Sequence, residues 1–356
     1  MDYKSDHTWL EKTIHNIAFA PWYPKLAISD FENSIYRSRI NSISITNPVF
    51  ITGLPRAGTT LLLELCVNSG EFASHTYKDM PFIFSPLLWD QVSRSFRNSG
   101  DLIERVHGDG IYINVESSES FEEVVWKEFW PSHYKQDRMI PWTGTKYPKF
   151  EDFFLDHMRK IILLRGETEA LQRYISKNNF NIARIEYISN TFPDATILIP
   201  FRSPIQHASS LLRQHLNFLK IHKQDKFARK YMNDTGHFDF GENLRPINYD
   251  HWLSSNTLSN SNDLSFWLVY WINTYKYLVN HASEKVKFFS FDLLCEDPKT
   301  GLEQLGQKIN IKNQEALFRN IDRIKAPKHF VIDGIDQDII NQANEILASL
   351  YEISNP

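Results

Sequence analysis

A short segment combines two glycines, an arginine and two threonines at the spacing of a phosphate-binding loop. It reads GLPRAGTT, with Gly53 and Gly58 separated by four residues, as in the Gly-x-x-x-x-Gly framework of a Walker loop. Glycine lets a backbone approach a phosphate closely, and the amides at the start of the following helix attract negative charge. The segment therefore predicts an anion-binding loop in which Arg56 and the amides of Ala57 to Thr60 contact the ligand.

The loop departs from the Walker pattern at one position. Thr59 stands where a nucleoside triphosphatase carries the lysine that reaches the β and γ phosphates. The positive charge lies within the loop instead, at Arg56, which suits a shorter anion bound without a metal ion. The simpler interpretation is a tight turn in which Thr59 or Thr60 caps the next helix.

A second arginine follows a different apolar run. Arg202 comes directly after TILIPF, and Ser210 lies eight residues further on, about two turns into a helix that begins near Pro204. A guanidinium at the end of a strand and a hydroxyl on the facing helix can bind one phosphate together. An arginine in such a turn is also often part of a surface ion pair, so the first loop strengthens the interpretation of the second.

These loops need strands that bring them to one edge of a sheet. Three apolar runs rich in β-branched and aromatic residues read as buried strands, each followed by a helix: residues 48–52, 196–201 and 285–291. Such a pattern is typical of a parallel sheet in an α/β fold. We expect one domain in which residues 1–46 form a helical cap, residues 81–181 a helical insertion over the strand ends, and residues 311–356 a helical C-terminal segment.

The composition excludes several classes of protein. The chain has 39 Lys and Arg against 43 Asp and Glu, a net charge of −4, which excludes a globally basic nucleic-acid binder. Cys66 and Cys295 are the two cysteines, too few for a disulfide framework, so reduced thiols are expected. Charged residues interrupt the first twelve positions, and the apolar runs are far shorter than the roughly 20 residues that span a bilayer. We expect a cytoplasmic protein without a transmembrane segment.

Three segments together resemble the sulfotransferases that use 3′-phosphoadenosine 5′-phosphosulfate (PAPS), in the broad group of bacterial and tyrosylprotein sulfotransferases. GLPRAGTTLLLELC is similar to their 5′-phosphosulfate loop, FPDATILIPFRSPIQHASSLLRQH to their 3′-phosphate motif, and FFSFDLLCEDP to a segment near the end of their core. Phe291, Asp292 and Leu293 depart from the usual Tyr-Glu-Asp-Leu of the third segment, which makes that match the weakest. The resemblance covers about residues 47–310 and implies a P-loop NTPase-like parallel β-sheet flanked by helices, with PAPS as co-substrate and no metal ion.

Carried over by motif, the resemblance implies a role for several residues. Binding of the 5′-phosphosulfate falls to Arg56, Gly58, Thr59 and Thr60, and binding of the 3′-phosphate to Arg202 and Ser210. Ala57 replaces the usual serine but keeps its backbone amide, and Arg56 would also place positive charge on the transferring group. Lys177 resembles the lysine of a Lys-Asp-Pro segment that stabilises developing charge, although Asn178 and Asn179 follow it here. The alternative for Lys177 is a solvated lysine at a helix end.

The base that removes the acceptor proton is less clearly marked. Related branches place a glutamate about twenty residues after the loop arginine, but this window reads FASHTYKDMPF and contains no glutamate. His75 and Asp79 are the titratable candidates there. Alternatively, His75 caps a turn and Asp79 pairs with Lys78 or Arg94. A further group of candidates has a simpler explanation in the preference of helix N-termini for negative charge: Glu116, Glu119, Glu122 and Glu123.

The sequence thus predicts sulfuryl transfer to a hydroxyl or amine of a carbohydrate, glycolipid or small molecule, with no nucleic-acid partner. The basic run at residues 220–230 is usually a solvated face but could guide an anionic acceptor. Aromatic residues of the insertion could stack on sugar or adenine, although most should be core: Trp89, Trp126, Trp130, Trp142 and Tyr147. Two alternatives remain, a P-loop kinase, against which the missing Walker lysine argues, and a nucleotide-binding module without a working base.

Overall fold

A five-stranded parallel sheet forms the centre of the computed structural model, with strand order β2-β5-β1-β6-β7. Its strands are β1 (Val49–Ile51), β2 (Phe72–Ala73), β5 (Arg173–Lys177), β6 (Thr196–Phe201) and β7 (Val286–Ser290). A separate antiparallel pair consists of β3 (Ile103–Glu104) and β4 (Tyr112–Ile113). The structure describes residues 9–94, 103–104, 112–113, 121–144, 146–166, 173–253, 260–325 and 334–354.

Alternation along the central strands gives each face of the sheet its own apolar core. Phe50 points into the larger core, whereas Val49 and Ile51 belong to a second core on the opposite face. On β6, Ile197 and Leu198 divide between the two cores in the same way. Because successive side chains of a strand point to opposite faces, strands that are apolar throughout must be covered on both sides. Helices cover both faces accordingly.

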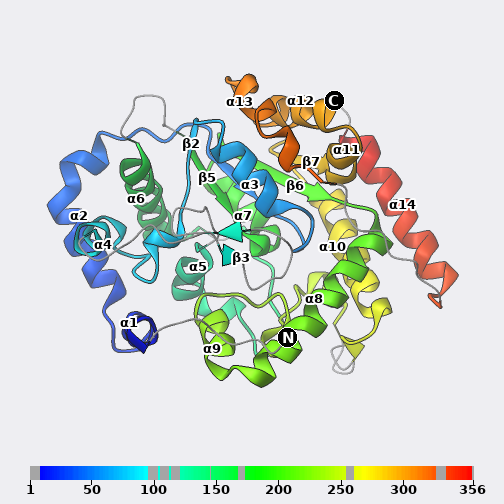
Figure 1. Ribbon diagram of the computed structural model, residues 1–356, viewed down its shortest axis with the longest axis horizontal. Helices are drawn as coiled ribbons and strands as arrows, with labels where there is room; N and C mark the ends of the chain where they lie inside the picture. Colours follow the sequence, from blue (N-terminus) through cyan, green and yellow to red (C-terminus); the bar gives the residue numbers. More distant parts are fainter. Residues whose placement is uncertain are drawn as a thin grey trace.

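The larger core is covered mainly by five helices: α5 (Glu123–Phe129), α6 (Pro148–Arg165), α7 (Ile185–Thr191), α8 (Pro204–Gln224) and α10 (Leu264–His281). The second core is covered by α3 (Thr59–Val67), α11 (Phe291–Glu296), α12 (Pro298–Lys308) and α13 (Gln314–Phe318). In Figure 1, α8 and α10 lie beside α14 (Gln337–Ser354) on the right. On the left, α2 (Lys25–Asn41) and α4 (Pro86–Ser93) lie beside α6. The remaining α-helices are α1 (Trp9–Ala18) and α9 (Lys226–Asp234).

The α/β fold class predicted from the sequence is confirmed, and one part of the expected organisation is corrected. The three expected strands form β1, β6 and β7. The region expected to be a helical insertion, residues 81–181, also contains β5, which pairs with β1. The run RYISK is short and ends in charged residues, so its apolar signal is easily absorbed into a helical interpretation of its surroundings. The correction matters because β5 carries Lys177 to the edge of the sheet where the glycine loop lies.

The predicted basic run lies at the junction of α8 and α9. Lys220, Lys223 and Lys226 are exposed, and Arg229 and Lys230 form ion pairs with acidic neighbours. The run is therefore a solvated face, and its guidance of an acceptor stays a prediction. Within the described ranges, no helix has the length and apolarity needed to cross a bilayer.

Candidate active site

The glycine loop connects β1 to the N-terminus of α3 through left-handed backbone conformations. Gly58, with φ +90°, precedes the first residue of α3, and Arg56 also has a positive φ of 70°. A Cβ atom at Gly58 would lie 2.0 Å from the ring of Phe291. Only glycine therefore fits this position, and the ring fixes how the loop enters the helix.

A buried histidine anchors the same loop from α8. His207 donates a hydrogen bond from Nε2 to the carbonyl of Pro55 at 2.8 Å. Burial, reinforced by the charge of Arg202, lowers the pKa of His207 to about 3, so the ring is neutral at ordinary pH. On the strand side, the Thr52 amide donates to the Leu198 carbonyl at 2.9 Å. The loop is thus held between β6 and α8.

The structure brings Arg56, Arg202 and Ser210 together. Arg202 donates from Nη1 to the Arg56 carbonyl at 3.0 Å, and Arg56 Nε lies 3.4 Å from the Ser210 hydroxyl, as a donor to it. The Nε atom of Arg202 is buried and has no hydrogen-bond partner among the described residues, with Asp292 at 3.6 Å in an ion pair. Two guanidinium groups and a hydroxyl therefore converge where the β1 and β6 loops meet, an arrangement suited to anions.

Residues that follow β5 extend this site. Lys177, the last residue of β5, is buried and lies in register with Ile51 of β1, so the alternative of a solvated lysine at a helix end is wrong. Asn179 accepts a hydrogen bond from Thr59 of the loop at 3.3 Å and donates one to Asp239 at 3.3 Å. Burial raises the pKa of Asp239 to about 6, against the opposing effects of the Lys177 charge and the Asn179 hydrogen bond.

His75 and Asp79 lie in a buried network of their own. His75 bonds to Asp79 through Nδ1 and to His157 through Nε2, both at 2.9 Å. Arg165 of α6 contacts both oxygens of Asp79, so this carboxylate pairs with Arg165 rather than with Lys78 or Arg94. Burial alone would raise the pKa of Asp79, but Arg165 and His75 hold it well below its usual range. A carboxylate with so low a pKa is a weak proton acceptor.

This network yields a stability prediction. Arg165→Met should destabilise the protein by about 3 kcal/mol, because it leaves the buried Asp79 carboxylate without its cation. The low pKa of Asp79 contributes stability above its unfolded value of about 3.9, and this is lost as the pH falls toward the folded value. In urea unfolding the wild type should therefore lose stability below about pH 4, and its advantage over the variant should shrink as the pH falls. Arg159→Met on the same helix is the control, since its partner Asp156 keeps Arg37.

Two glutamates of the further group of base candidates, Glu122 and Glu123, stand at the start of α5, as the helix N-terminus interpretation expects, and both are buried. Glu123 binds Arg184 and accepts a hydrogen bond from Asn178 at 2.7 Å, and Glu122 binds the hydroxyl of Tyr174. Structural partners therefore hold Glu123, whereas Glu122 has one hydroxyl partner on Oε1 and, among the described residues, none on its buried Oε2. Glu116 and Glu119 lie outside the described residues.

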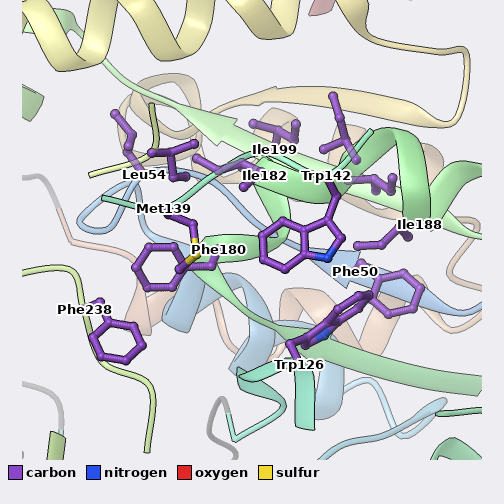
Figure 2. Packing of buried hydrophobic residues seen from close by; sticks show 14 of the residues in the cluster. Phe50, Leu54, Trp126, Met139, Trp142, Phe180, Ile182, Ile188, Ile199 and Phe238 are labelled. Carbon is purple, nitrogen blue, oxygen red and sulfur yellow. The ribbon is translucent and has the colours of Figure 1, made fainter. Parts of the chain in front are cut away.

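Two of the five aromatic residues named from the sequence are fully buried core residues, as expected for most of them. Trp126 and Trp142 lie in the larger core with ring centroids 6.3 Å apart, and Figure 2 shows both among its buried side chains. Trp130 and Tyr147 pack against this core, and the indole of Trp89 donates to the Met80 carbonyl at 2.8 Å.

Sequence reasoning assigned no role in the site to four residues that lie there in the structure: Asn179, His207, Asp239 and Asp292. His207 lies inside the 3′-phosphate motif close to Arg202, and Asp292 lies inside the third recognised segment, so membership of these motifs was a usable signal for both. Asn179 follows the Lys177 segment and Asp239 lies 60 residues later in no recognised motif, so only the fold brings them together. Within the described ranges, no group of three or more His, Cys, Asp or Glu residues is arranged to bind a metal ion.

A parallel sheet with a glycine loop after its central strand and an arginine loop after the adjacent one defines a P-loop-like α/β protein. The chain belongs to the sulfotransferase family, because the model of that family matches residues 48–239, more than half of the sequence. No curated protein matches the sequence significantly.

Solved structures similar to this chain are bacterial sulfotransferases. Sulfotransferase STF9 from Mycobacterium avium is 12% identical with a TM-score of 0.50, covering 95% of this chain and 83% of that one. Sulfotransferase STF1 from Mycobacterium tuberculosis is 11% identical with a TM-score of 0.46, covering 91% and 81%. A sulfotransferase from Alicyclobacillus acidocaldarius is 12% identical with a TM-score of 0.37, covering 86% and 95%. At 12% identity, the similarity to STF9 supports the fold alone.

Proposed function

We propose that this sulfotransferase uses PAPS as its donor and transfers the sulfuryl group to a hydroxyl or amine of a carbohydrate, glycolipid or small molecule. The observation that carries the proposal is the convergence of Arg56, Arg202 and Ser210 at the junction of two loops. PAPS presents two anionic groups, and the chain offers two cationic groups on adjacent loops. The lysine of a kinase P-loop is absent from the loop sequence GLPRAGTT, where Thr59 takes its position.

The residues present fit such a donor. The loop approaches closely because Gly58 has no side chain, and the amides of Ala57, Thr59 and Thr60 lie at the N-terminus of α3, which favours negative charge. The Nε of Arg202, which has no hydrogen-bond partner among the described residues, is a buried donor that an anion would satisfy. Arg56 and the loop amides would hold the 5′-phosphosulfate, and Arg202 with Ser210 the 3′-phosphate.

Two features of the chain would favour transfer. When bound, the donor supplies a sulfuryl group activated by its phosphate anhydride. Arg56 and Lys177 would hold positive charge against the oxygens on which negative charge builds up. The position of Lys177 at the carboxyl end of β5, in register with Ile51 just before the glycine loop, supports this role. Because these groups are fixed by strands and buried contacts, they need little rearrangement.

Calorimetric titration with 3′-phosphoadenosine 5′-phosphate (PAP), the desulfated donor, tests the proposal. The wild type should bind it equally well with and without a chelator, and Arg56→Ala should weaken binding by about 10- to 100-fold because a charged hydrogen-bond donor is lost. Arg94→Ala is the control, since that side chain is 75% exposed and pairs with Asp90 outside the site. No binding of PAP, or binding of ATP only with magnesium, would contradict the proposal and favour a kinase.

A further inference from the structure

Two aromatic side chains hold Asp239 at the edge of the candidate site. Asp239 lies between α9 and the next helical turn, and its neighbours Phe238 and Phe240 are both buried. Phe238 packs with Phe180 at a centroid distance of 6.2 Å, and Figure 2 shows both rings in the larger core. Phe240 stacks on Phe218 of α8. Asp239 itself remains partly accessible, so the chain presents a carboxylate on a rigid apolar support.

The segments that contain Phe180 and Phe238 also contact each other through polar side chains. Asn179, which directly precedes Phe180, donates from Nδ2 to Oδ2 of Asp239 at 3.3 Å. The side-chain oxygen of Asn179 accepts from Thr59, the first residue of α3, at 3.3 Å. The side-chain amide of Asn179 therefore connects Asp239 to the start of α3, which would hold the phosphosulfate. Its hydrogen bond uses Oδ2 of Asp239 and not Oδ1.

Three other acidic groups, Asp79, Glu123 and Asp292, are occupied differently. Arg165 contacts both oxygens of Asp79, and Arg184 and Asn178 bind Glu123. Asp292 accepts from the Ser203 amide at 2.6 Å and pairs with Arg202. Among the described residues, Asp239 has a neutral hydrogen-bond partner, the side-chain amide of Asn179. An ion pair lowers the proton affinity of a carboxylate, whereas a neutral partner in a poorly hydrated position preserves it.

The charged and titratable groups that act on Asp239 come from three elements. Lys177 on β5 favours its ionised form, and Glu123 on α5 opposes it. Burial raises the pKa of Tyr270 on α10, so this neighbour stays neutral. Burial of the carboxyl prevails over these influences and raises the pKa of Asp239 to about 6. A carboxylate of this kind is ionised at neutral pH and accepts a proton more readily than an ordinary one.

From this placement we propose that Asp239 is the general base of the sulfuryl transfer, an inference that rests on the proposed function. The acceptor oxygen attacks sulfur, and its proton passes to Oδ1 of Asp239 as the new O–S bond forms. The bond between sulfur and the bridging phosphate oxygen breaks, and its electron pair stays on PAP. The products are a sulfate ester, PAP and a protonated Asp239, which returns its proton to solvent.

Asp239→Asn tests this step, because asparagine keeps the shape and an oxygen that accepts from Asn179. The variant should bind PAP like the wild type, which separates the base from the donor site. Transfer from PAPS to 4-methylphenol, whose hydroxyl is protonated at neutral pH, should fall by about 100-fold or more. Transfer to 4-nitrophenol, which is substantially ionised at neutral pH, should fall much less. Asp137→Asn, an exposed carboxylate paired with Arg138, is the control and should match the wild type.

The pH dependence supplies a second readout. Wild-type transfer to 4-methylphenol should rise with pH through about 6, and Asp239→Asn should lose this dependence. In carbon-13 NMR of aspartate-labelled protein, the carboxyl signal that the wild type shows and Asp239→Asn lacks belongs to Asp239. In the wild type this signal should titrate at about pH 6. Unchanged transfer to 4-methylphenol, or an equal loss with both phenols, overturns the proposal. So does a carboxyl that titrates at the ordinary value of about 3.9, whether or not either phenol is a substrate. Failure of the wild type to bind PAP would instead count against the proposed function.

Discussion

Replacing Arg202 with alanine is expected to lower the affinity for PAP by about 100-fold or more. Arg202 donates to the Arg56 carbonyl at 3.0 Å, and its Nε is a buried donor that a phosphate would satisfy. Hydrogen bonds to charged groups contribute about 1.5–3 kcal/mol each. The loss of two such bonds between the Arg202 guanidinium and the 3′-phosphate therefore corresponds to a change of this size. The variant also leaves Asp292 without its cation beside the site, which repels an anionic ligand.

Titration with AMP, which lacks the 3′-phosphate, distinguishes recognition from support of the loop. If Arg202 binds the 3′-phosphate, the wild type should prefer PAP to AMP, and Arg202→Ala should lose that preference while its weaker affinity for AMP changes little. Arg229→Ala, a half-exposed arginine of α9 paired with Glu242, should keep the wild-type preference. An equal loss for PAP and AMP would show that Arg202 acts by holding the loop rather than by binding the 3′-phosphate.

The parts of this site that the sequence predicts are those built from local spacing. The glycine loop and the start of α3 lie within eight consecutive residues, so backbone freedom and helix position can be read directly. Arg202 and Ser210 are likewise joined by a strand end and two turns of one helix. The fold class follows from the three apolar strands, because strands buried on both faces leave a continuous apolar run.

The candidate base shows where local reasoning fails. His75 and Asp79 are selected by their distance along the chain from Arg56, but Arg165 reaches Asp79 from 86 residues away and changes its chemistry. Asp239 is selected by nothing local, since its partner Asn179 lies 60 residues before it, in the turn after a strand that is hidden within a region that reads as helical. Proton affinity depends on burial and on partners from other elements, and a single sequence specifies neither.

Gly58→Ala is expected to abolish PAP binding and to lower the free energy of unfolding by about 3 kcal/mol or more. The new Cβ would lie 2.0 Å from the Phe291 ring, at a residue whose φ of +90° already disfavours any side chain. The left-handed conformation costs about 1–2 kcal/mol, and overpacking in a filled site adds about 1–3 kcal/mol. Because Gly58 directly precedes α3, relief of the clash must shift the amides that would bind the donor.

Gly70→Ala separates the two causes, since Gly70 has a φ of +81° but no atom of the described residues lies within 4 Å of the new Cβ. Urea unfolding should therefore show only the conformational cost for Gly70→Ala, with PAP binding retained. The double variant Gly58→Ala/Phe291→Ala should lose less stability than the two single changes combined, because removal of the ring opens space for the new methyl group. Equal costs for Gly58→Ala and Gly70→Ala would contradict this account, since the contact with Phe291 would then contribute nothing to the shape of the loop.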